Sequence, residues 1–62
     1  MKRYGIWNTH EDVQEVTNIS KDEVICFADT ERAVNTNHKQ TITTLNQAQS
    51  LLESIGYVVE KI

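Results

Sequence analysis

The clearest pattern of apolar positions lies between residues 45 and 55, where intervals of three and four place them in one stripe along a helix. The stripe consists of Leu45, Ala48, Leu51, Leu52 and Ile55. Thr44 and Gln47 have the spacing of a capping box, in which the hydroxyl and the amide side chain each bond to the other residue's backbone. Gly56 follows, where a left-handed glycine commonly ends a helix. We therefore predict a helix over residues 45–55.

Residues 2–8 alternate in the way that a β-strand does, with successive side chains on opposite faces. Tyr4 and Ile6 point to one face, and Arg3 and Trp7 point to the other. If helices cover only the first face, the indole of Trp7 is exposed. Exposed tryptophans often anchor protein interfaces, so this side chain is a candidate for contact with a partner.

Two further segments have the composition of strands. Residues 23–28 are rich in β-branched and aromatic residues and almost continuously apolar, which predicts a strand covered on both faces or paired with another copy. Residues 57–62 form a short β-prone segment. The pattern leaves two alternatives for its apolar side, Val58 with Ile62 or Tyr57 with Val59.

Two segments stay ambiguous. Residues 9–19 fit either a short helix beginning at Thr9 or a hairpin loop followed by a strand over residues 14–18. Between residues 32 and 44, a strand fits around 33–35 or around 40–44, and the dense threonines favour extended structure in the second.

We predict an α+β fold in one domain over residues 1–62, with an antiparallel sheet of three to four strands and one amphipathic helix, 45–55, on one face. The alternative is a compressed βαββαβ arrangement with a first helix at 9–18. The first is preferred because so short a helix with two or three apolar contacts has little to stabilise it.

The length of 62 residues makes stability marginal, because a domain of this size buries only about 60% of its unfolded surface. Cys26 is the only cysteine, so an internal disulfide is excluded, and a lone thiol fits a reducing compartment. No apolar run approaches the roughly 20 residues that cross a bilayer. We expect a cytoplasmic protein, without a membrane partner, that gains stability as a homodimer.

Charge is unevenly distributed along the chain. The net charge is −3, but residues 11–31 contain seven acidic residues and one lysine, a local balance of −6. Adjacent carboxylates in these polar segments read as a solvated acidic face, because acid–base chemistry would need burial to separate their pKa values. Such a face can steer a basic partner. The candidate partner-binding residues are Trp7, Glu11, Asp12, Glu15, Asp22 and Glu23.

The sequence gives only weak signals for a catalytic or metal-binding site. A thiol nucleophile at Cys26 would need His10 or His38 as its base, and we instead expect the thiol to be buried in a core strand. The two histidines are 28 positions apart and have no spacing typical of a metal site. No phosphate-binding glycine motif is present. We expect no enzyme activity, no cofactor and no metal.

The resulting hypothesis is a small non-catalytic module that binds another protein: an adaptor, inhibitor or assembly factor. The order of its elements resembles many small accessory proteins, including ones that phages and other mobile elements encode, without a specific shared motif. One alternative is a nucleic-acid binder that uses Lys2, Arg3 and Lys39 with Tyr4 or Trp7 as a stacking surface. The other is a small-ligand or metal binder with its site between two copies.

Overall fold

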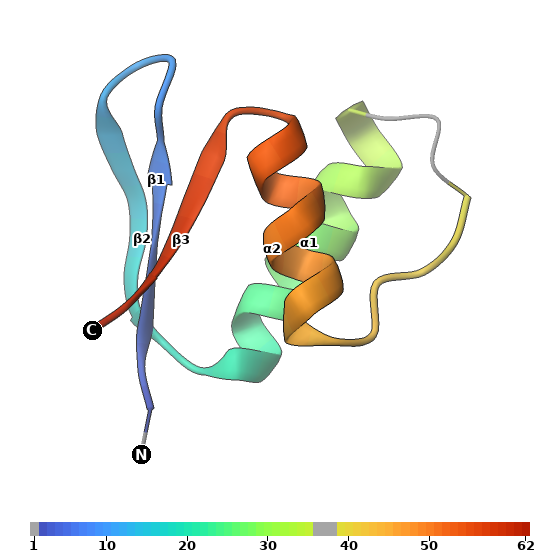
Figure 1. Cartoon of the computed structure of the whole chain (residues 1–62), viewed down its shortest axis with the longest axis horizontal. Helices are drawn as coiled ribbons and strands as arrows, with labels where there is room; N and C mark the ends of the chain where they lie inside the picture. Colours follow the sequence, from blue (N-terminus) through green and yellow to red (C-terminus); the bar gives the residue numbers. More distant parts are fainter. Residues whose placement is uncertain (1, 36–38) are drawn as a thin grey trace.

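The computed structural model describes residues 2–35 and 39–62. In chain order its elements are β1 (Tyr4–Asn8), β2 (Val13–Ile19), α1 (Lys21–Asn35), α2 (Leu45–Ser54) and β3 (Tyr57–Lys61). The strands form one antiparallel sheet in the order β2-β1-β3, and both helices lie on the same side of it (Figure 1). The α+β class predicted from the sequence is confirmed. Within the described ranges, neither helix is long and apolar enough to span a bilayer.

The sheet turns one face towards the helices and leaves the other uncovered. Tyr4 and Ile6 are buried on the inner face, whereas Trp7 is 36% exposed on the outer one, as the alternation predicts. Ile6 pairs with Val59 across the β1–β3 ladder. Of the two alternatives for the last strand, the inward side is therefore Tyr57 with Val59, and both pack against the core.

A hairpin turn joins β1 to β2, so the ambiguous segment 9–19 is a turn and a strand. The side-chain oxygen of Asn8 accepts the backbone N–H groups of His10 and Glu11 at 3.0 and 3.3 Å. Asp12 adopts a φ of 54°, a left-handed conformation that aspartate tolerates better than most residues. The βαββαβ alternative, which needed a helix in this segment, is wrong.

The strand predicted over residues 23–28 is also wrong, because the segment lies inside the 15-residue helix α1. Ser20 caps this helix: its Oγ accepts the backbone N–H of Glu23 at 3.3 Å and donates to the Glu23 carboxylate at 3.3 Å. Val24 and Ala28, one helical turn apart, are fully buried. The cap and these core contacts override the β-propensity of the segment. The described part of the chain thus contains two helices where one was expected.

Neither strand considered between residues 32 and 44 is present in the described part of the chain. Residues 33–35 belong to the last turn of α1, and residues 36–38 lie outside the described ranges. Residues 40–44 are extended towards α2 without pairing as a strand. Thr43 and Thr44 instead form hydrogen bonds with Gln47 at the N-terminus of α2 and do not take part in a sheet.

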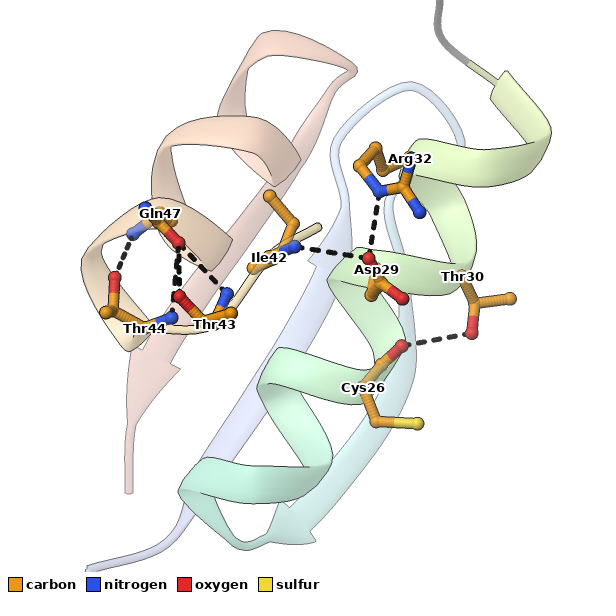
Figure 2. A network of polar contacts seen from close by, with 8 residues as sticks. All are labelled: Cys26, Asp29, Thr30, Arg32, Ile42, Thr43, Thr44 and Gln47. Atoms are coloured by element: carbon orange, nitrogen blue, oxygen red, sulfur yellow. Dashed lines mark hydrogen bonds and ion pairs between the residues drawn. The ribbon is translucent and has the colours of Figure 1, made fainter. Parts of the chain in front are cut away.

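A single carboxylate holds this connecting segment against α1. Asp29 accepts the backbone N–H of Ile42 at 3.2 Å and the Nε–H of Arg32 at 2.8 Å (Figure 2). The bond from Arg32, followed by that from Ile42, holds the pKa of Asp29 below its ordinary value of 3.8. Ile42 itself is buried, so the bond to its backbone positions a core side chain.

The second helix is confirmed, including its capping box. The backbone N–H of Gln47 donates to Thr44 Oγ1 at 3.2 Å, and Gln47 Oε1 accepts the backbone N–H of Thr44 at 3.3 Å (Figure 2). The same oxygen accepts the backbone N–H of Thr43 at 2.9 Å. The core between sheet and helices consists of Tyr4, Ile6, Val24, Ala28, Ile42, Ala48, Leu51 and Leu52.

The hairpin turn is fastened to the turn between α2 and β3 at Gly56. The backbone N–H and the hydroxyl of Thr9 donate to the Gly56 carbonyl oxygen at 2.8 and 2.6 Å. Gly56 has a φ of 95°, and the His10 imidazole occupies the space where a Cβ would be. Glycine is therefore required here on two grounds, its backbone conformation and the close approach of the ring.

Gly56→Ala is expected to lower the free energy of unfolding by roughly 2–3 kcal/mol, because a left-handed non-glycine residue and a steric overlap add together. Urea denaturation measures this loss. Gly5→Ala is the matched control, since a Cβ there would lie 3.0 Å from the flexible end of the Gln14 side chain. Equal losses in the two variants would contradict the assigned role of Gly56.

Asp29→Asn is expected to destabilise the protein at neutral pH and to have no effect in strong acid. Because the pKa of Asp29 in the folded protein is depressed, its carboxylate stabilises the fold above about pH 4. That contribution is lost as the pH falls below 3.8 and through the folded-state pKa. Denaturant titrations of wild type and variant should converge in that range. Asp12→Asn, which removes a charge in the hairpin turn and touches none of the Asp29 bonds, is the control and should lower stability at neutral pH by less than Asp29→Asn does.

Candidate protein-binding groove

A groove of about 330 Å³ lies between the edge strand β2 and the helix α1, and is called here the β2–α1 groove. It exists because α1 packs mainly against α2 and reaches the sheet at β1, which leaves β2 largely uncovered. Its walls are formed by Val16 and Ile19 from β2, and by Glu23, Cys26, Phe27, Thr30 and Glu31 from α1.

The helix can line this groove because its apolar residues are not confined to the core side, and Cys26 and Phe27 add apolar surface next to it. Val24 and Ala28 face the core, while the groove residues of α1 recur at intervals of three, one, three and one, which is a second side of the same helix. Phe27 lies at the boundary, with its ring 5.6 Å from that of Tyr57 in an edge-to-face contact. The continuous apolar run that looked like a doubly covered strand is thus a helix with a core side and a groove side.

The opposite wall is an edge of the sheet. In the described part of the chain, β2 pairs with β1 alone, and that pairing is irregular on either side of Ile6. Asn18 has a φ of 58°, which marks one of these irregularities. Val16 and Ile19 remain half-buried on the inner face, in contact with the core but open towards the groove.

Negative charge surrounds the apolar part of the groove. Glu23 lies in the first turn of α1, and Glu31 lies two turns further along the same side. The Tyr57 hydroxyl is 3.4 Å from the Glu31 carboxylate. The pKa of Tyr57 is raised above 10.0, first by burial and then by the negative charges of Glu31 and Glu15. The end of the groove next to the hairpin therefore has a negative potential.

The predicted partner-binding residues fall into separate groups. Glu11 and Asp12 lie in the hairpin turn, and Glu15 follows in β2, where its carboxylate accepts the Asn8 amide at 3.2 Å. The first turn of α1, with Asp22 and Glu23, lies at the other end of β2 (Figure 1).

Trp7 is on the outer face of the sheet, away from both helices. The structure does not join it and the acidic residues into one surface.

The residues that sequence reasoning missed are Val16, Ile19, Phe27, Thr30 and Glu31. A signal for them was present in the sequence. Ser20 and Glu23 have the spacing of a helix start, and a helix beginning there would have placed the α1 members of this set on one side. The strand interpretation concealed that side.

The thiol and the histidine in the described ranges are not brought together. Cys26 is exposed on α1, which corrects the expectation of a buried strand position, and Thr30 Oγ1 donates to its carbonyl at 3.0 Å (Figure 2). His10 packs on Gly56 at the hairpin turn. His38 lies outside the described residues. Among residues 2–35 and 39–62, no cluster of three or more His, Cys, Asp or Glu side chains is placed to hold a metal ion.

A second hollow, of about 440 Å³, lies between residues 40–42 and α2. The described residues of its lining carry no charge and are Gln40, Thr41, Ile42, Asn46, Gln47, Ser50, Leu51 and Ser54. The β2–α1 groove is the stronger candidate site, because it combines apolar walls with charge and therefore offers both affinity and selectivity.

Comparison with known proteins gives no match: no family model, curated protein or solved structure is significantly similar to the chain. The chemistry of the groove is therefore the basis for assigning a function.

Cys26 is expected to react with a thiol reagent in the folded protein at a rate within about tenfold of that in denaturant, because its side chain is exposed in the groove. Absorbance after addition of a disulfide reagent measures this rate, with Cys26→Ser as the blank. A thiol that reacts only after denaturant is added would show that the groove is closed in solution.

Proposed function

We propose that this chain is a non-catalytic protein-binding module whose β2–α1 groove receives a segment with both apolar and basic side chains. The observation that supports this most directly is the composition of the groove: the apolar surface of Val16, Ile19 and Phe27 lies between the carboxylates of Glu23 and Glu31.

The two kinds of groove residue have different roles in binding. Burial of the apolar walls supplies affinity, and a groove of about 330 Å³ is large enough for about two apolar side chains of a partner. The carboxylates supply orientation and selectivity, because they attract arginine or lysine and repel acidic segments. An adaptor, an inhibitor and an assembly factor would each use such a surface.

Nucleic-acid binding is the weaker hypothesis. Tyr4 is only 6% exposed, so it offers no stacking surface. The N-terminal strand, which follows Lys2 and Arg3, and the segment that begins at Lys39 lie on opposite sides of the molecule (Figure 1). The groove would also repel phosphates, because the charged side chains among its described residues, Glu23 and Glu31, are both acidic.

A randomised peptide library displayed on phage, selected against the folded protein, tests this proposal. We expect the selected peptides to be enriched in arginine or lysine next to large apolar residues. Glu23→Gln with Glu31→Gln should weaken their binding roughly tenfold, since each exposed charge pair contributes up to about 1 kcal/mol. Calorimetry measures the change, and salt increased from about 0.05 M to about 0.5 M should reduce the difference.

The matched control is Asp12→Asn with Glu53→Gln, which removes the same charge from exposed positions outside the groove. Binding to this variant should stay within about twofold of wild type. Selection of no peptide, or of peptides that bind all three proteins equally, would contradict the assignment of the groove.

A further inference from the structure

The outer face of the sheet is uncovered, because both helices pack on the inner one (Figure 1). Large apolar side chains are exposed there. Trp7 and Val58, which are direct cross-strand neighbours, are each 36% exposed, and Ile62 is 66% exposed. This set is called here the outer apolar face.

Gly5 makes this face flat. It lies on the same side of β1 as Trp7, and its missing Cβ leaves room for two neighbouring side chains. The Cβ position is 3.0 Å from Gln14 Nε2 and 3.5 Å from Ile62 Cδ1. The side chains of Gln14 and Ile62 therefore lie over the backbone of the central strand at Gly5. No side chain projects from Gly5 itself, so the face is flat there and another flat surface can contact it closely.

The charges on the outer face differ from those of the groove. Glu60 lies opposite Gly5 in the ladder, and the Arg3 carbonyl oxygen accepts the backbone N–H of Ile62 at 2.8 Å, which continues the β1–β3 pairing. By the alternation of a strand, the side chain of Arg3 is on the same side as Gly5 and Trp7, so Arg3 and Glu60 both border the outer apolar face. Neither forms an ion pair with another described residue. One positive and one negative side chain make the face neutral and self-complementary, since a twofold axis can place each Arg3 opposite the Glu60 of a second copy.

We infer that two copies of this chain associate through the outer apolar face, with the two grooves pointing away from each other. A second copy is the occupant favoured by charge, because the acidic surfaces elsewhere repel another copy and this neutral face does not. A strongly basic or acidic partner would find no net charge here. The inference does not depend on what the grooves bind.

The area of the outer apolar face determines how tightly two copies are expected to associate. The central strand β1 and its neighbour β3 have five residues each and β2 has seven, so the length shared by all three strands is about 16 Å and their combined width about 14 Å. The area of such a face is small beside the roughly 800 Å² that each partner buries in a standard interface. We therefore expect a dimer that forms at micromolar or higher concentration and dissociates on dilution.

Sedimentation equilibrium between about 5 μM and about 500 μM tests the inference, because a weak dimer has a mass that rises with concentration. Trp7 is the only tryptophan, so its emission should shift to shorter wavelength over the same range as the indole becomes buried.

Ile62→Lys should raise the dissociation constant about tenfold or more, because it places a charge in the apolar contact. Val34→Lys is the control, since Val34 is exposed on α1 and away from the sheet.

A charge exchange identifies the face itself. Arg3→Glu alone and Glu60→Arg alone should each weaken association, and the two together should restore it to within about threefold of wild type. Thermal unfolding of each variant checks that the fold is retained. The mass of one chain at every concentration would overturn the inference, and so would a dimer that Val34→Lys weakens and Ile62→Lys does not.

Discussion

The other features of this structure depend on how much of the sheet its helices can cover. Two helices on three strands can cover one face, and here they cover that face incompletely: α1 reaches the sheet at β1 and leaves β2 exposed. The groove and the bare outer face both follow from this shortage. A further helix could close each of them, so both open surfaces follow from having two helices against a three-stranded sheet in the described part of the chain.

The position of α1 depends on its beginning. The Ser20 hydroxyl starts the helix directly after the edge strand, so the chain reverses direction before it can pair again as a strand. Asp29, which is part of the same helix, accepts the backbone N–H of Ile42 and so holds Ile42 in the core. Because one helix serves the core, the connection and the groove, it carries apolar residues, Cys26 and Phe27, beyond its core side.

Local signals predicted the elements that local interactions determine. The second helix was predictable because the stripe, the Thr44–Gln47 capping box and Gly56 all indicate the same boundaries. The first helix was missed because β-branched residues and an apolar run outweighed a short capping signal at Ser20. The groove could not be predicted, since Val16 and Phe27 meet only through the way in which α1 crosses the sheet. Charge alone indicated the acidic region, but not which of its members share a surface.

The bond between Thr9 and Gly56 also bears on how the chain folds. It joins residues 47 positions apart, and the central strand β1 has its second neighbour, β3, at the far end of the sequence. An isolated two-stranded hairpin is marginal in water, so β1 and β2 have little independent stability before the last strand arrives. A stable sheet therefore requires the chain to close a loop that spans most of its length. The entropy cost of that loop favours a single cooperative and comparatively slow folding transition over stepwise assembly.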